Sequence, residues 1–98
     1  MSELAKVLLE TLTFKPQTRA ELCDKLHCGE RAVRRAVEEL RECGYNIASN
    51  SETGGYWLGS EADRERTINE LRSRARKLEQ TAAALEKGVD IGQMEVAL

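Results

Sequence analysis

Three arginines stand close together near the middle of the chain and are the first candidates for a chemical role. Arg31, Arg34 and Arg35 lie in the segment ERAVRRAVEEL, at spacings that place them on one side of a helix. A guanidinium group can pair with guanine O6 and N7 through two hydrogen bonds, and it also binds phosphate. The three side chains cannot all reach one base. We therefore expect one or two of them to read bases in DNA and the others to bind phosphate.

The charge order along this predicted helix supports a role for the arginines outside the fold. The helix is expected from Glu30 to Cys43, and three acidic residues follow the arginines: Glu38, Glu39 and Glu42. Acidic side chains are normally favoured near a helix N-terminus and basic side chains near its C-terminus. Apart from Glu30 the order here is reversed, which costs some local stability. The pattern indicates that the arginines serve an external partner.

A second set of residues could bind a metal ion. Cys23 and His27 stand one helical turn apart, and Cys28 and Cys43 follow. The chain has no C-x₂-C pair, however, and Cys23 occupies a position suited to a small buried residue. We predict no metal site and no cofactor. One histidine and solvent-facing acids cannot form a catalytic triad, a phosphate loop or a paired-carboxylate cleft, so we also predict that the chain is not an enzyme.

Length and composition limit the remaining possibilities. The 98 residues correspond to one small domain with an appended element, and the formal net charge is −2. This charge is unusual for a DNA-binding domain, because neutralising phosphates supplies most of the non-specific affinity. No run of about 18 apolar residues predicts a membrane span, and the N-terminal segment is too short and too acidic for a secretory signal. Three unevenly spaced cysteines fit a reducing compartment, so we expect a cytoplasmic protein.

Two further helices are expected ahead of the arginine-bearing one. The first should run from about Ser2 to Leu12, with Phe14 packing beneath the next loop and Pro16 preventing continuation. Its apolar stripe comprises Leu4, Val7, Leu8 and Leu12. The second should begin at a capping box formed by Thr18 and Glu21 and end near His27. Its predicted buried side comprises Ala20, Leu22, Cys23 and Leu26.

Short strands and a turn-rich loop follow the third helix, whose predicted stop is Gly44. Tyr45 and Ile47 should share one face of the first strand, and Tyr56 and Leu58 one face of the second. Residues 50–55 are rich in turn-forming types and predict a hairpin loop, the wing of a winged helix. Trp57 lies on the opposite side of its strand, where we expect the last helix to cover it; a dimer contact is the alternative.

The last element is predicted to be one long helix, opened by Ser60 and Asp63 and unbroken to Lys87. Apolar residues recur at alternating intervals of three and four, the heptad spacing of a coiled coil. These residues, here called the heptad stripe, are Ile68, Leu71, Ala75, Leu78, Ala82, Leu85 and Val89. We predict a helix–helix dimer. The alternatives are a helix that packs on its own domain, an antiparallel pair and a larger bundle. Residues 88–98 contain two glycines and are expected to be a flexible tail.

Four sequence segments together resemble the winged helix-turn-helix of biotin-operon repressors and related bacterial and phage regulators. They are EL…KL before the turn, RAVRR at the start of the third helix, EELRE-x-GY at its end, and GGY-x-L in the second strand. The resemblance covers roughly residues 3–59. It implies DNA binding, with the third helix as reader and with Thr18 and Arg19 near a backbone phosphate. The added heptad helix looks like small phage-borne or prophage regulators.

These observations predict a mainly α fold with a small β-hairpin: a winged helix-turn-helix over residues 1–59, followed by a dimerisation helix over residues 60–87. The predicted function is that of a dimeric, sequence-specific transcription regulator that places its third helix in the major groove of double-stranded DNA. The predicted DNA-binding residues are Thr18, Arg19, Arg31, Arg34, Arg35, Asn50, Ser51 and Thr53. The rival hypothesis is a winged-helix module that binds proteins rather than DNA, which the acidic net charge and the lack of positive charge in the wing favour.

Overall fold

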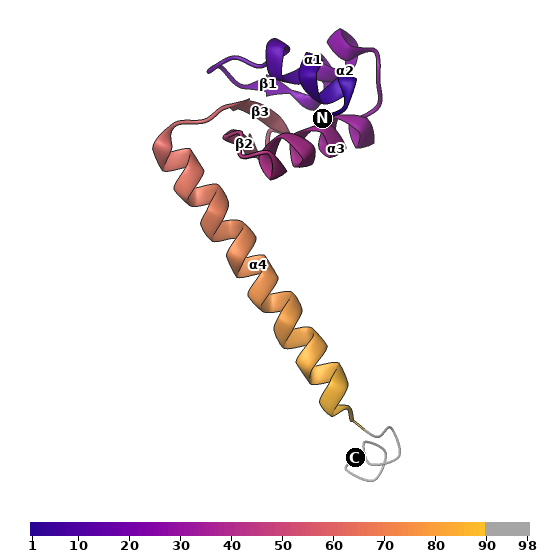
Figure 1. The fold of residues 1–98 in the computed structure, drawn as a ribbon, viewed down its shortest axis with the longest axis vertical. Helices are drawn as coiled ribbons and strands as arrows, with labels where there is room; N and C mark the ends of the chain where they lie inside the picture. Colours follow the sequence, from indigo (N-terminus) through magenta and orange to yellow (C-terminus); the bar gives the residue numbers. More distant parts are fainter. Residues whose placement is uncertain (90–98) are drawn as a thin grey trace. The chain divides into compact units, whose positions relative to one another are not determined.

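The computed structural model describes residues 1–89, and the predicted tail therefore lies almost entirely outside the described residues. The first compact unit spans Met1–Thr67, and the second begins at Ile68, inside the last helix. Figure 1 labels the elements, which follow the order α1 (Glu3–Thr11), β1 (Gln17–Thr18), α2 (Arg19–Leu26), α3 (Glu30–Glu42), β2 (Ile47–Asn50), β3 (Gly55–Leu58) and α4 (Glu61–Lys87). The fold is mainly helical, with a small sheet after the helix-turn-helix, as predicted.

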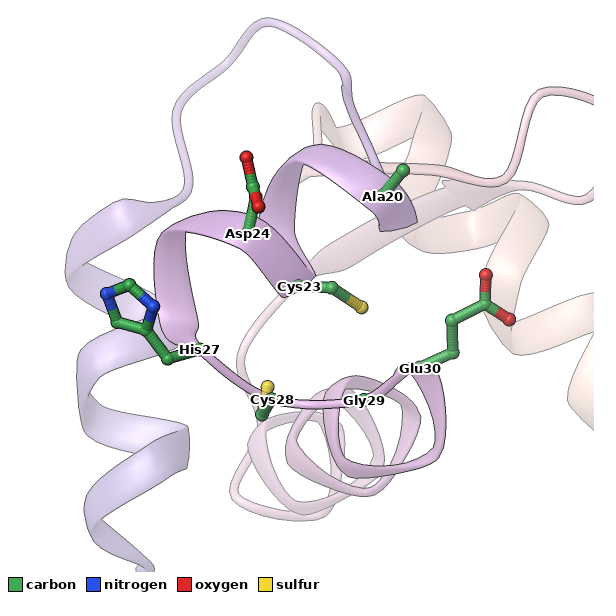
Figure 2. Close-up of a pocket in the computed structure, with 7 residues that line it drawn as sticks. All are labelled: Ala20, Cys23, Asp24, His27, Cys28, Gly29 and Glu30. Atoms are coloured by element: carbon green, nitrogen blue, oxygen red, sulfur yellow. The ribbon is translucent and has the colours of Figure 1, made fainter.

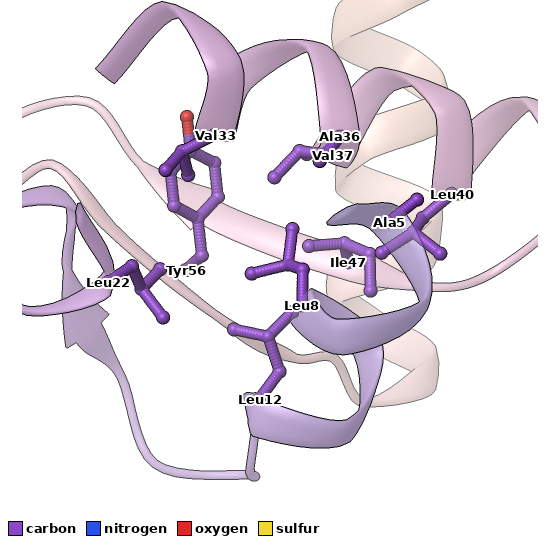
Figure 3. Packing of buried hydrophobic residues seen from close by; sticks show 10 residues of the cluster. All are labelled: Ala5, Leu8, Leu12, Leu22, Val33, Ala36, Val37, Leu40, Ile47 and Tyr56. Carbon is purple, nitrogen blue, oxygen red and sulfur yellow. The ribbon is translucent and has the colours of Figure 1, made fainter. Parts of the chain in front are cut away.

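The core of the first unit lies where α1, α2 and α3 pack together over the sheet (Figure 3). Apolar side chains from all three helices and from β2 and β3 are buried there: Ala5, Leu8, Leu12, Leu22, Val33, Ala36, Val37, Leu40, Ile47 and Tyr56. The spacing of the α3 members confirms its predicted buried face. Because each element contributes only a few of these side chains, the helix-turn-helix and the sheet depend on one another for their stability.

The predicted burial of α1 is wrong in part. Val7 is 39% exposed, and Ala5 is fully buried in its place. The small side chain of Ala5 lets α1 approach α3 closely, and the Ser2 hydroxyl donates a hydrogen bond to Glu39 Oε2 at 2.7 Å. This contact fixes the rotation of α1 about its axis, which apolar spacing alone did not determine. The hydrogen bonds from Ser2 hold the pKa of the Glu39 carboxyl below its usual value.

Three further side chains lie where the sequence did not predict them. Phe14 is 78% exposed, because its loop turns through a Thr13–Lys15 hydrogen bond and leaves the ring outside the core. Ala20 is exposed on the outer side of α2. Tyr45 precedes β2 instead of sharing a face with Ile47, and it is 42% exposed.

The sheet has three antiparallel strands in the order β1-β3-β2, so the predicted two-stranded hairpin was incomplete. The missed strand β1 pairs Gln17 with Tyr56. Gln17 is buried, and its side chain donates to the Thr11 carbonyl at 3.1 Å and accepts from Lys25 Nζ at 2.5 Å. A strand of two residues has no readable alternation. Only its partners β3 and α2 identify it.

Both ends of α2 agree with the sequence-based prediction. The Thr18 hydroxyl accepts the Glu21 backbone N–H at 3.1 Å, and the Glu21 carboxylate faces the Thr18 backbone N–H, which completes the capping box. His27 ends the helix in the left-handed conformation, with φ at 52°. These local contacts set the start and the direction of the turn that leads into α3.

Gly29 is the N-cap of α3 and offers no side-chain hydrogen bond to the helix. Its backbone is extended, and a Cβ atom added there would meet nothing within 4 Å. Ser is a much better N-cap than Ala, by about 1 kcal/mol. We therefore expect Gly29→Ser to be more stable than Gly29→Ala by about this amount, measured as free energy of unfolding in denaturant. Equal stabilities would show that the α3 N-terminus gains nothing from a side-chain cap.

The junction between β3 and α4 is closed by hydrogen bonds to Asp63. Its carboxylate accepts the Ser60 backbone N–H at 2.9 Å and the Trp57 indole N–H at 3.1 Å, and the Ser60 hydroxyl accepts the Asp63 N–H in return. Trp57 is thus attached to the first turn of α4, as expected. On the other side, the Asn46 side chain donates to the carbonyls of Gly59 and Ser60 at 3.0 and 2.8 Å. The first turn of α4 is consequently part of the winged-helix unit.

This junction predicts a pH dependence of stability. The Ser60 backbone hydrogen bond and then the Trp57 indole lower the pKa of Asp63 from its ordinary 3.8. A lowered pKa in the folded state means that the stabilisation is complete above the ordinary value and is lost as pH falls through the lower folded value. Asp63→Ala should therefore lose less stability than the wild type between pH 6 and pH 3. Trp57, the one tryptophan of the chain, reports unfolding by its fluorescence.

Asp24→Ala is the matched control, because Asp24 is an exposed carboxylate without a hydrogen bond among residues 1–89. This variant should keep the wild-type pH dependence. If Asp63→Ala and Asp24→Ala change with pH in the same way, the Asp63 contacts do not stabilise the junction.

The helix α4 contains 27 residues, none of which is buried. At 1.5 Å per residue its length is about 40 Å. It ends as predicted at Lys87, where the Gly88 N–H donates to the Ala84 carbonyl at 2.9 Å and Gly88 takes a φ of 71°. Within the described residues, no helix is both long and apolar enough to cross a membrane.

Candidate nucleic-acid interface

The outer face of α3 carries the three predicted arginines, here called the arginine cluster (Arg31, Arg34 and Arg35). All three are exposed, whereas Val33 and Val37 on the opposite face are buried. Within residues 1–89, no hydrogen bond or ion pair engages their guanidinium groups. The cluster is therefore uncovered and can bind anionic groups from outside. Glu38 follows on the same face one turn later and limits the positive surface to the first half of the helix.

Arg41, on the same helix, has a structural role that the sequence analysis missed. Its Nε and Nη2 atoms donate to the Ile47 carbonyl at 2.9 and 2.6 Å, and Nη2 also donates to the Ser49 hydroxyl at 3.2 Å. These bonds attach the end of α3 to β2. Arg41 is also the basic residue in the last turn that the helix dipole favours. The signal was its place in the last turn, apart from the cluster.

The start of α2 and the wing lie side by side, although about 35 residues separate them in sequence. Thr18 pairs with Gly55 in the sheet, and the Arg19 N–H donates to the Gly54 carbonyl at 3.0 Å. The Arg19 guanidinium lies over Gly54, where an added Cβ would come within 3.0 Å of its Nε and Nη2 atoms. The fold thus places one positive charge at the base of the wing. The predicted pair Thr18 and Arg19 is joined to this loop rather than to α3.

The Thr18 hydroxyl already takes part in the α2 cap. It accepts the Glu21 N–H and donates to the Glu21 carboxylate at 3.2 Å. A negative carboxylate therefore stands beside the position predicted for a phosphate. Of the two residues at the start of α2, Arg19 is the better candidate for that contact.

The wing loop is folded tightly and carries no positive charge of its own. The Asn50 side-chain carbonyl accepts the backbone N–H groups of Glu52 and Thr53 at 2.9 and 3.4 Å. The Gly54 N–H donates to the Asn50 carbonyl at 2.7 Å. Asn50, Ser51 and Thr53 are exposed as predicted, so their polar groups are accessible from solvent. The Asn50 carbonyl oxygen, however, is occupied by the turn.

The predicted metal alternative gains only two of its residues in the structure. Cys23 and Cys28 line a depression beside the turn between α2 and α3, whereas Cys43 is exposed at the far end of α3 (Figure 2). The His27 ring is directed away from the two sulfur atoms. Within residues 1–89, no three histidine, cysteine or acidic side chains come together as a metal-binding group.

The sheet, the capped turn and the exposed face of α3 define a winged helix-turn-helix. The comparison with protein families agrees, because residues 4–56, more than half of the 98-residue chain, match the helix-turn-helix (HTH) domain family. The chain belongs to this family, which indicates a DNA-binding regulator. No curated protein and no solved structure gives a significant match.

Proposed function

We propose that the chain is a sequence-specific transcription regulator of the biotin-operon repressor type that binds double-stranded DNA as a homodimer. The observation that carries this proposal is the exposed arginine cluster at the start of α3, with no partner among the described residues. Arginine pairs bidentately with guanine in the major groove, at about 1–3 kcal/mol of discrimination for each pair. In a helix-turn-helix, the N-terminal residues of the second helix are the ones that reach base edges.

Contacts from the rest of the unit would position α3 on the duplex. Arg19, which lies over Gly54, is suited to a backbone phosphate beside the wing. Thr18, Asn50, Ser51 and Thr53 are proposed to contribute neutral polar contacts. Such contacts orient the protein on the duplex without reading sequence. This division leaves base recognition to α3.

The heptad stripe supports the proposed dimer. Four of its large members are exposed in the single chain: Ile68 at 39%, Leu71 at 45%, Leu78 at 66% and Leu85 at 77%. A second copy of the helix would cover them, and Arg74 of one helix would attract Glu79 of the other in a parallel pair. Small alanines at Ala75 and Ala82 would allow close helix approach.

Dimerisation also resolves the objection raised by the net charge. One domain with a formal net charge of −2 has little non-specific affinity for DNA. Linking two reading units makes the second contact intramolecular and raises the overall affinity. The half-site centres are then expected about 34–36 Å apart, or a multiple of that distance. A cytoplasmic location and a phage or prophage context are part of the same proposal.

Binding to random duplex DNA at increasing salt tests this function against the rival protein-interaction module. A DNA-binding protein should lose affinity linearly on a log–log plot, with a slope of about −0.9 for each phosphate contacted. Selection of bound sequences from a random library should then return a two-fold symmetric site. Absence of binding at low salt would favour the module that binds proteins.

A further inference from the structure

The turn between α2 and α3 brings two cysteines together. The Cys28 N–H donates to the Cys23 carbonyl at 3.1 Å, and the His27 N–H donates to the same carbonyl. With His27 in the left-handed conformation, this is a helix end of the Schellman type. In that motif the side chains three positions before the C-cap and two positions after it commonly contact each other. Cys23 and Cys28 occupy these two positions.

Both thiols are free, half-buried and accessible from one depression. Its volume is about 610 Å³, and Asp24 and Glu30 are among its lining residues. Figure 2 shows both sulfur atoms on the side of the turn that faces the start of α3. The two sulfurs are thus the donor atoms that converge there, and the nearby carboxylates give the depression a negative potential.

The surroundings favour a cation over an oxidant as the partner of these thiols. Burial first, and then Cys28, Glu30 and Asp24, raise the pKa of Cys23 above its ordinary 9.0, against a smaller opposite effect of Arg19. Thiol oxidation to a disulfide begins with a thiolate, which a raised pKa makes scarce at neutral pH. A soft metal cation displaces the protons itself and is attracted by the carboxylates.

We propose that Cys23 and Cys28 form a two-coordinate site for a soft monovalent cation of the copper(I) type. Thiolate sulfur selects such ions, and a filled d shell accepts two ligands in line. Zinc in proteins almost always takes four ligands, and no group of even three donors forms among residues 1–89. Each binding event forms two copper–sulfur bonds and releases two protons, without electron transfer.

The site would act as a clamp on the helix-turn-helix. Cys23 belongs to α2, and Cys28 directly precedes Gly29, the N-cap of α3. An ion bound only by the folded turn stabilises the fold in proportion to its occupancy. Copper(I) should therefore raise the thermal midpoint of the chain.

The test is an anaerobic titration of the full chain with copper(I) in competition with a chromogenic copper(I) chelator. We expect one copper per wild-type chain and a raised thermal midpoint. Cys28→Ser, Cys23→Ser and Cys23→Ala should lose both effects. Cys43→Ser is the matched control and should keep both. Circular dichroism verifies that each variant is folded, and Cys28→Ser provides the test if the half-buried Cys23 tolerates no change.

Three results would overturn the proposal. Folded Cys23 and Cys28 variants could retain copper as the wild type does. Copper could bind at half an equivalent and require Cys43, which would indicate a bridge between chains. Zinc could bind with the same cysteine dependence and raise the midpoint equally, which would exclude a two-coordinate soft-ion site. None of these measurements uses DNA, so their outcome is separate from that of the DNA-binding proposal.

Discussion

Replacing Arg34 and Arg35 together by alanine should abolish specific DNA binding and leave the thermal midpoint nearly unchanged. Both side chains are exposed on α3, and neither has a hydrogen bond or ion pair within residues 1–89, so the fold loses no contact. Each base-reading arginine contributes about 1–3 kcal/mol. Loss of two such contacts corresponds to an affinity decrease of at least about 30-fold. Fluorescence anisotropy with a selected site measures this decrease, and calorimetry measures the midpoint.

A charge-matched control separates contact from net charge. Lys6→Ala with Lys87→Ala removes the same two positive charges from α1 and from the end of α4. This control should lower affinity only modestly and in a strongly salt-dependent way. If the Arg34 and Arg35 variant instead unfolds at a much lower temperature, these arginines are structural. If both double variants bind equally, α3 is not the reader.

The second large effect is expected in the heptad stripe. Leu71→Glu with Leu78→Glu places charges where two helices would pack, and charged groups are costly to bury without partners. Sedimentation should then give a monomer of 11.0 kDa in place of a dimer of twice that mass. The Met1–Thr67 unit should keep its fold, because these leucines lie outside it. DNA affinity should fall with the loss of the second reading unit.

The matched control places the same charges two residues further along the helix. Ser73→Glu with Gln80→Glu lies outside the heptad stripe and should leave the dimer intact. A wild-type chain that sediments as a monomer at micromolar concentration would contradict the proposed dimer. So would a leucine variant of unchanged mass. An increase to a trimer or tetramer in the wild type would keep the stripe as an interface but change its stoichiometry.

Much of the winged helix could be read from the sequence because its signals are local. Caps such as Thr18 with Glu21, and Ser60 with Asp63, act over three residues, within one helical turn. The buried face of α3 follows from a spacing repeated over several turns. The exposure of the arginine cluster followed from the same spacing, since residues opposite a buried stripe face outward. These features need no knowledge of distant parts of the chain.

The errors concern interactions between residues that are distant in sequence. The strand β1 exists because Gln17 pairs with Tyr56, and two residues carry no pattern of their own. Ala5, rather than Val7, is buried because Ser2 binds Glu39 and sets the rotation of α1. A narrow apolar stripe permits several rotations, and the packing partner selects one of them.

For this protein, then, the amino-acid sequence by itself determined the helices and their caps, the wing loop, the exposed arginines and the heptad stripe. Only the tertiary structure decided that Arg41 attaches α3 to β2, that Arg19 lies over Gly54 in the wing, and that two thiols meet at the turn. The physical reason is the range of the interactions. Helix periodicity and capping act within a few residues, whereas side-chain contacts across the core depend on how the elements pack together.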